Sequence, residues 1–265
     1  MRQFRNTTVF INATDVASAS LPQSTLATPW YVPPPQVDAI SGVGRIPSDD
    51  SLFEDRVESY LDRIASYQVG QVLFTSLPTS FPVVISRMTD ADKKRLGETN
   101  AETSTSADTL FINRIGYNGH IKIIFPDPLD YDGGPATSPH EKLMHELTHA
   151  FDMGTHGGYA DDRKMTGKVV GYNVPELFDD FAEFFAILIT NIMISEYGTQ
   201  LRLHHHGHAV IPSSIGDSKS YYKAFEKPIE GLWDRNRIFM YRLANLKMPK
   251  FNPLSYHFLT EEDFP

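Results

Sequence analysis

Apolar residues recur at helical spacing along residues 51–68. They fall at positions 52, 53, 57, 60, 61 and 64, which places them on one face of an amphipathic helix. Two later runs, 81–88 and 119–128, are rich in β-branched residues and predict short strands. Residues 89–108, between these runs, are polar throughout, so the pattern predicts an exposed loop there.

A well-marked helix start follows the second predicted strand. Ser138 fits an N-cap, Pro139 the first helical position and Glu141 the third, which together form a capping box. The helix is predicted to run from Pro139 to about Met153 and to stop at Gly154.

A second helix is predicted over residues 173–198. Asn173 and Glu176 have the spacing of a capping box, and Gly198 provides a stop. The stretch "FAEFFAILI" inside this helix is apolar except at Glu183. A carboxylate in such surroundings costs several kcal/mol unless something compensates its charge.

The order of these elements predicts one α+β domain over residues 49–265. A small sheet would pack on the helix that begins at Pro139, and a largely helical C-terminal part would follow. Residues 1–48 are rich in Ser, Thr, Pro and Ala and contain "PWYVPPP", which favours extended chain. We expect them to form a leader or linker that lies along the domain. With 265 residues, 41% of them hydrophobic, the chain can bury one substantial core.

Composition narrows the classes of function. The chain has no cysteine, so His, Asp and Glu must hold any metal ion. The formal net charge is −9 and there is no long basic run, so nucleic acid is not an expected partner. Residues 219–250 contain eight Lys or Arg against three Asp or Glu, and we interpret them as a solvated helix face.

The sequence shows no pattern of a membrane span or a signal peptide. No apolar run reaches the roughly 18 residues of a transmembrane helix. Polar residues at positions 6, 12 and 15 interrupt any signal-peptide pattern.

The stretch "LMHELTHAFDM", residues 143–153, contains the pattern H-E-x-x-H at His145, Glu146 and His149. Two imidazoles four residues apart lie on one helix face and can supply two corners of a tetrahedral zinc site. Glu146 follows the first of them, where its carboxylate can take a proton from a water molecule. The sequence therefore predicts one catalytic Zn²⁺ on this helix.

A catalytic zinc site needs a third protein ligand, and four acidic residues of the second helix are candidates. Glu176 already has a role in the capping box, and Asp179 and Asp180 lie where they complement the helix dipole. Glu183 is the only charge in the apolar segment, and coordination to zinc would offset its burial. We therefore prefer Glu183 as the third ligand, with a histidine from elsewhere as a further alternative.

Several other side chains are candidates for contact with the substrate or its oxyanion. The stretch "LHHHGHA" gathers four histidines, for which a polar turn is the alternative interpretation, and three tyrosines could also donate a hydrogen bond. The histidines are His204, His205, His206 and His208, and the tyrosines are Tyr172, Tyr221 and Tyr222. From this set we single out Tyr172, His206, His208 and Tyr221.

The motif "HELTHAF" resembles the active-site helix of the zincin metallopeptidases, and HELTH is its form in thermolysin-like enzymes. At the spacing of the thermolysin-like glutamate ligand this chain has Val169. The stretch "AEFFA", residues 182–186, instead resembles anthrax lethal factor and similar toxin peptidases, and this likeness implies Glu183 as the ligand. Those toxins also carry an aspartate after the second histidine, which implies that Asp152 orients a ligand imidazole. Where lethal factor has its active-site tyrosine, this chain has Glu176.

The wider arrangement, over roughly residues 50–200, is similar to the bacterial effector peptidases of the M91 type and to the metallopeptidase domain of some type VI secretion spike proteins. The resemblance implies a gluzincin-type zinc endopeptidase that acts on a protein or peptide. It also implies a secreted toxin or effector, delivered from the cytoplasm of the producing cell without a clear signal peptide. A secretion-system spike or an immunity protein would be a further partner. The strand at 119–128 would bind extended substrate by β-augmentation.

Two other functions fit the same residues. A non-catalytic zinc-binding adaptor or interaction protein would close the metal with four protein ligands, for example with a histidine from residues 204–208. A metal-dependent amidase would cut a cell-wall linkage. Our main prediction is the zinc peptidase, in which Glu146 is first the general base and then carries the proton to the leaving amine.

Overall fold

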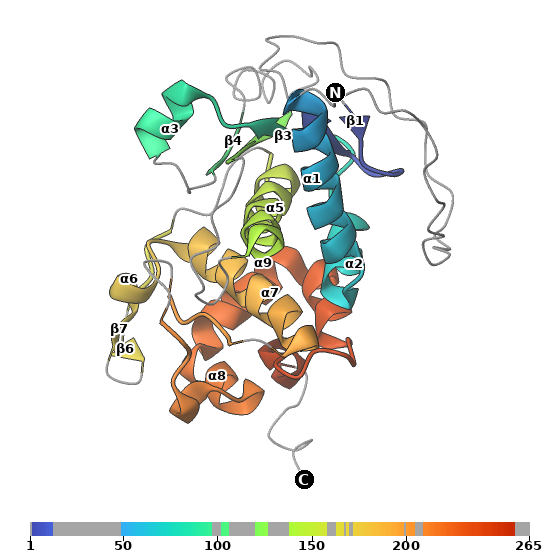
Figure 1. The fold of residues 1–265 in the computed structure, drawn as a ribbon. Coiled ribbons are helices and arrows are strands. Elements are labelled where there is room, and N and C mark those ends of the chain that lie inside the picture. Colours follow the sequence, from blue (N-terminus) through green and yellow to red (C-terminus); the bar gives the residue numbers. More distant parts are fainter. Residues whose placement is uncertain are drawn as a thin grey trace.

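A five-stranded sheet and a set of helices make up the α+β fold of the computed structural model (Figure 1). The structure describes residues 2–12, 49–96, 102–105, 120–126, 138–157, 163–166, 168–169, 172–198, 200–204 and 209–257. The strands of the sheet are β1 (Arg2–Gln3), β2 (Val9–Asn12), β3 (Val83–Arg87), β4 (Glu102–Thr105) and β5 (Ile121–Phe125), and β6 (Lys168–Val169) pairs with β7 (Tyr172–Asn173). The helices are α1 (Asp49–Ala65), α2 (Gln68–Phe74), α3 (Asp90–Leu96), α5 (Pro139–Thr155), α6 (Val174–Leu177), α7 (Phe181–Tyr197), α8 (Ser218–Ala224) and α9 (Glu226–Ala244), with short 3₁₀ turns at Ser213–Ile215 and Pro253–Tyr256. The predicted α+β class is confirmed.

The centre of the sheet is parallel and deeply buried. The strand order is β1-β2-β3-β5-β4, in which β2, β3 and β5 are parallel and the two outer strands are antiparallel to their neighbours. Ile85 of β3 pairs with Ile11 on one side and Ile123 on the other, and none of the three has exposed surface. Strands buried on both faces carry continuous apolar runs, which is why the sequence pattern reveals β3 and β5.

Residues 2–12 belong to the sheet, so the leader predicted for residues 1–48 is wrong at its beginning. β2 pairs along its whole length with β3, and Phe4 in the turn before it packs on Phe74 with ring centroids 5.4 Å apart. The apolar run of β2, "VFI", has only three residues, which is shorter than the roughly four to eight residues over which a strand pattern is read. Residues 13–48 lie outside the described residues, and the division of the chain at residue 48 stays a prediction.

Strand β4 and helix α3 lie in the segment 89–108, where the polar pattern predicted only a loop. The sequence of β4, "ETST", has no apolar residue to mark it, although Thr is well suited to a strand. β4 pairs antiparallel with β5, with Thr103 opposite Ile123. Because β5 therefore lies between β3 and β4, the prediction that residues 119–128 offer a free edge to the substrate is wrong.

The amphipathic helix predicted near residues 51–68 is confirmed as α1, and α2 follows it closely. A Cβ atom at Gly70 would lie 2.0 Å from the carbonyl oxygen of Ile64, so only glycine allows this close approach. The start of α2 is fixed from α7, because the Glu196 carboxylate accepts the backbone N–H groups of Gln68 and Val69, both at 2.9 Å.

The capping box predicted at the start of α5 is confirmed, since the Glu141 carboxylate accepts the backbone N–H of Ser138 at 2.9 Å. The helix runs through Gly154, however, where the sequence pattern predicted a stop. A Cβ atom at Gly154 would lie 2.5 Å from Cγ of Pro78. Glycine at this position therefore allows close packing and does not end the helix.

The helix predicted over 173–198 is in fact two helices, α6 and α7. Asp180, and not Asn173, caps the longer one, and its Oδ1 accepts the backbone N–H of Glu183 at 3.0 Å. Gly198 ends α7 as predicted, with a φ of 85° that glycine adopts without strain.

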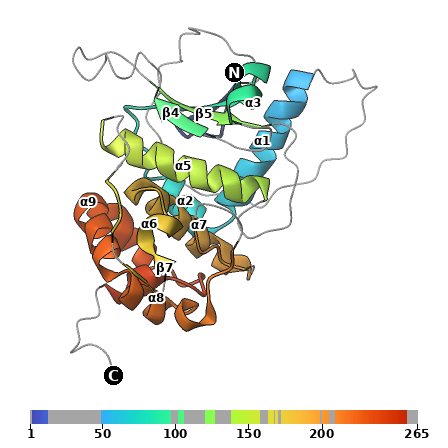
Figure 2. The ribbon, with the colours of Figure 1, turned by 90° about the vertical axis from the view of Figure 1, so that its left-hand side faces the viewer.

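Helix α5 occupies the middle of the molecule. Figure 2 shows it beneath the sheet, with α7, α8 and α9 on the side away from the strands. It contacts β4 and β5 on one side and α7 on the other. Leu143, Met144 and Leu147 of α5 have no exposed surface. None of the helices in the described part of the chain is both long and apolar enough to cross a membrane.

Candidate metal centre

Helix α5 brings two predicted ligands to one point. The Nε2 atoms of His145 and His149 lie 3.0 Å apart, and the rings meet edge to face with an interplanar angle of 81°. Both residues are buried, with exposed fractions of 8% and 9%. Because Met144 and Leu147 anchor α5 in the core, the two imidazoles are held on a fixed helix face.

Glu183 reaches the same point from α7. Its Oε2 lies 3.1 Å from Nε2 of His145, and its Oε1 lies 3.3 Å from Nε2 of His149. The cap that Asp180 forms with the Glu183 N–H fixes the backbone of this first turn. Phe184 next to it is fully buried, so α7 cannot turn without opening the core. The structure thus brings together the three residues that the sequence analysis preferred as ligands.

These three side chains form a group that could hold a metal ion, with one candidate ligand atom from each lying within 4.8 Å of the others. Tetrahedral zinc, with bonds of about 2.0–2.1 Å, separates neighbouring ligand atoms by about 3.3 Å. The two Nε2 atoms are 3.0 Å apart, and they lie 3.1 and 3.3 Å from different oxygens of the Glu183 carboxylate, which are distances close to that value. Two imidazoles and one carboxylate are also a common ligand set of catalytic zinc. The residues therefore fit a zinc ion.

Burial and mutual charge shift the pKa values of all three groups. Burial lowers the pKa of His145, against the opposing influence of Glu183. Burial also acts to lower the pKa of His149, but the charge and hydrogen bond of Glu183 outweigh it and raise that pKa to about 9. Burial acts to raise the pKa of Glu183, yet His149 and His145 hold it far below its usual range. At neutral pH the metal-free group therefore holds a proton that a metal ion must displace.

Glu146 lies on α5 directly after His145 and has an exposed fraction of 8%. Its charge contributes to raising the pKa of His145 and of His149. It is not a member of the three-residue group. This position suits a base beside the metal.

Asp152, which the resemblance assigns to orienting an imidazole, is 1% exposed and lies one turn after His149. Its carboxylate accepts hydrogen bonds from Arg235, with Nε 3.1 Å from Oδ1 and Nη2 3.4 Å from Oδ2. Nδ1 of His156 lies 3.2 Å from the same Oδ1. The sequence analysis missed Arg235 because it treated residues 219–250 as a solvated face. The local sequence around a single arginine on an amphipathic helix does not show that it pairs with a distant, buried residue.

The other predicted site residues lie in different places or cannot be placed. Asp180 caps α7, and the Asp179 carbonyl accepts a hydrogen bond from Lys164, so neither belongs to the metal-binding group. Tyr221 has no exposed surface and packs on Phe225 with ring centroids 4.5 Å apart, which leaves nothing for a substrate to touch. Outside the described residues lie His205, His206, His208 and the side chains of Tyr172 and Glu176.

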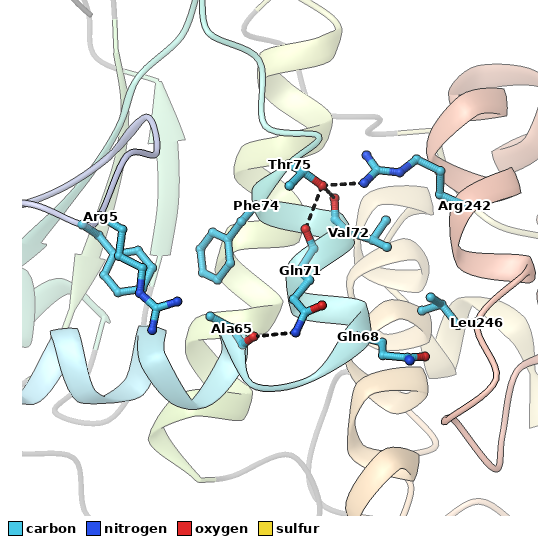
Figure 3. A pocket seen from close by; sticks show the side chains of 10 residues that line it. Arg5, Ala65, Gln68, Gln71, Val72, Phe74, Thr75, Arg242 and Leu246 are labelled. Atoms are coloured by element: carbon cyan, nitrogen blue, oxygen red, sulfur yellow. Dashed lines mark hydrogen bonds between the residues drawn. The ribbon is translucent and has the colours of Figure 1, made fainter. Parts of the chain in front are cut away.

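A hollow of about 520 Å³ lies elsewhere, among α1, α2, α9 and the turn after β1 (Figure 3). Its walls combine the rings of Phe4 and Phe74 with the charged side chains of Arg5 and Arg242. Figure 3 shows the Arg242 guanidinium at the end of α2, where it donates to Oγ1 of Thr75. None of the three candidate ligands lines this hollow. It is therefore separate from the metal centre.

Comparison with known proteins relates the candidate centre to peptidases. Residues 45–172 match the family model Peptidase M91, which is described as an effector protein. The matched part contains the helix that bears His145, Glu146 and His149, and it ends before Glu183. Neither the curated proteins nor the solved structures that we searched contain a match. The family match supports a hydrolase of peptide bonds, and it confirms the resemblance of this chain to the M91-type effector peptidases.

Proposed function

We propose that this protein is a zinc-dependent endopeptidase. His145, His149 and Glu183 would hold one zinc ion, and Glu146 would act as the general base. The observation that carries the proposal is the convergence of α5 and α7, which brings the Glu183 carboxylate oxygens to 3.1 and 3.3 Å from two imidazole nitrogens that are themselves 3.0 Å apart. The match of the H-E-x-x-H region to a peptidase family supports the choice of reaction.

Proton transfer by Glu146 accounts for the chemistry of hydrolysis. Zinc bound at the three ligands would supply a Lewis acid and lower the pKa of a water molecule to about 7. Glu146 accepts a proton from the attacking water while the water oxygen bonds to the carbonyl carbon of the substrate. Glu146 then gives this proton to the leaving nitrogen as the C–N bond breaks. One water is consumed, and a carboxylic acid and an amine are formed.

An extended substrate would bind along β4. Among the described strands β4 is the last of the sheet, and it contacts α5, the helix that carries the base. Main-chain hydrogen bonds to such an edge favour any extended peptide over a folded chain. This assignment replaces β5, which β4 covers. For the donor to the oxyanion, Tyr172, His206 and His208 are our candidates, and single substitutions to Phe or Ala should lower kcat for the residue that serves.

The biological setting follows from the family. An effector peptidase acts on a protein substrate after delivery to a target cell, and the M91 match supports both points. We further propose synthesis in the cytoplasm of the producing bacterium before export. A secretion-system spike or an immunity protein would then be a partner of the folded domain.

The test combines metal analysis with cleavage of a proteome-derived peptide library. We expect about one zinc per chain, loss of cleavage with a chelator and recovery on adding zinc. Glu146→Gln should keep the zinc and lower kcat by about a hundredfold to ten-thousandfold, the usual contribution of a general base. A wild-type protein that binds no zinc, or a Glu146→Gln variant of normal activity, would show that the proposal is wrong.

A further inference from the structure

We propose that Arg235 is a positioning residue of the metal centre and acts through Asp152. The inference rests on the proposed function. Arg235 belongs to α9, lies 83 residues from Asp152 in sequence and falls outside the part of the chain matched to the M91 family. Its role is to fix a buried carboxylate one helical turn beyond the ligand His149.

The geometry of the pair restrains Asp152 strongly. Two nitrogen atoms of the guanidinium meet the two carboxylate oxygens, at 3.1 Å and 3.4 Å. A planar guanidinium in this two-point contact sets both the position and the orientation of the carboxylate. His156 adds a third restraint, because its Nδ1 lies 3.2 Å from Oδ1 of Asp152 and 2.7 Å from the backbone oxygen of the same residue.

Stability alone is a weak reason for such a pair. The Asp152 side chain is only 2% exposed, whereas Arg2 pairs with Asp55 and Glu58, whose side chains are 59% and 38% exposed. Burying the Asp152 carboxylate costs about as much free energy as its attraction to Arg235 returns, although the Arg235 side chain is 22% exposed, so apolar side chains of similar size would stabilise the α5–α9 contact about equally well. The charged pair is explained if the carboxylate itself is needed beside the ligands.

Asp152 lies where a fixed charge acts on a ligand. It follows His149 by three residues on α5, so the two side chains lie on neighbouring positions of one helix face. Groups beyond the ligand shell orient ligand imidazoles and strengthen their binding to the metal. With Arg235 removed, the carboxylate would have one restraint fewer and its charge would move relative to the ring.

The backbone of α9 supplies a second, independent observation. Asn236, the residue after Arg235, has a φ of −128° and a ψ of 40°, so the helix is broken at this point. The break contains neither proline nor glycine, the usual local causes. Asn236 is 7% exposed, which places the break in the interior. The break follows directly after Arg235, the residue of α9 that contacts Asp152.

The test is a double-mutant cycle of Arg235→Met and Asp152→Asn, with Arg235→Lys as the conservative variant. Zinc affinity is measured by chelator competition, kcat and KM on a cleaved peptide, and stability by denaturant unfolding of the zinc-free protein. We expect each single variant to bind zinc about 10–100-fold more weakly and to lose kcat more than KM. The double variant should be no worse than the singles, because both changes act through one carboxylate. Arg235→Lys should recover part of the loss.

Controls separate this inference from a merely structural role. Arg2→Met breaks the surface ion pairs of Arg2 with Glu54, Asp55 and Glu58 and should change neither zinc affinity nor kcat. If Arg235→Met does not fold, the visible spectrum of the cobalt-substituted Arg235→Lys variant is compared with that of the cobalt-substituted wild type. Identical spectra would overturn the inference. Lower stability with unchanged zinc affinity and kcat would overturn it as well. A wild-type protein without zinc affinity would overturn the proposed function together with this inference.

Discussion

Helices α5 and α7 have the same length, 17 residues, and meet at the candidate metal centre, yet their sequences are of different kinds. α5 mixes charged and apolar residues, and its buried positions include His145, Glu146 and His149. α7 is apolar along most of its length, and Glu183 is the only acid before its final turn. One helix supplies several chemical groups, and the other supplies a single ligand.

The two helices position their side chains at this site in different ways. On α5, helical spacing alone sets the relative positions of the side chains. Glu183 gains its place from the packing of α7, whose Phe184, Phe185 and Leu188 are at most 1% exposed. A ligand on a turn that cannot shift is held to the tolerance that a metal site needs.

Among these variants, Glu183→Ala should have the largest effect on zinc binding, because it removes the one group that α7 contributes. Zinc affinity should fall by more than about a hundredfold, because even residues outside the ligand shell cost about 10–100-fold. Chelator competition and cleavage assays measure both losses. Glu196→Gln on the same helix is the matched control. Its carboxylate caps α2, so it should reduce stability by about 1 kcal/mol and leave zinc affinity unchanged. Full zinc retention by Glu183→Ala would refute the ligand assignment.

Tyr197→Phe tests the far end of the α5–α7 contact. The Tyr197 hydroxyl donates to Oε1 of Glu141 at 2.6 Å, and Glu141 is only 5% exposed. Removing a donor from a buried carboxylate should cost about 1.5–3 kcal/mol in the free energy of unfolding. Zinc affinity should not change, because Tyr197 lies at the opposite end of α7 from Glu183. A stability loss below about 0.5 kcal/mol, measured with denaturant, would contradict the importance of this bond.

The two helix caps sharpen the comparison further. Asp180→Ala and Ser138→Ala should each destabilise the protein by about 1 kcal/mol, the usual cost of losing an N-cap side chain. Only Asp180→Ala should also weaken zinc binding, by about tenfold, because its cap fixes the turn that carries Glu183. The cap at Ser138 lies almost two turns before His145. Equal zinc affinity in the two variants would mean that the α7 cap does not position the ligand.

The cluster of candidate ligands could be predicted because each member has a recognisable pattern in the local sequence. His145 and His149 show helical spacing, and Glu183 is the one charge in an apolar run. Arg235 has no such pattern. Its partner is a buried aspartate 83 residues away, and only the tertiary fold brings the two together. Whether Tyr172 or the histidines near 204–208 complete the site stays a prediction.

The elements of the fold also differ in whether the local sequence predicts them. Strands β3 and β5 and the amphipathic α1 could be predicted, because their buried apolar residues form a pattern over several positions. β2 has an apolar run of only three residues, "VFI", and β4 has no apolar residue, so neither shows a strand pattern. The two glycines near helix ends look alike in sequence but differ in cause. Gly154 makes room for Pro78 inside α5, whereas Gly198 ends α7 with a positive φ. The local sequence does not show whether a glycine is needed for close packing or for its backbone conformation.

His156→Gln should have the smallest effect, and it probes a feature of α5 that α7 lacks, a titratable group at its C-cap. The side-chain hydrogen bond with Asp152 raises the pKa of His156 above 6.5. A group whose pKa is raised on folding stabilises the protein fully below its unfolded pKa, and this contribution is lost as pH rises through the folded value. The zinc-free wild type should therefore exceed the variant in stability more at about pH 5.5 than at about pH 8.5. The difference should be less than about 1 kcal/mol, because His156 is partly exposed to solvent. Denaturant unfolding at the two pH values measures it, and an equal difference at both would show that the Asp152 contact does not favour the charged imidazole.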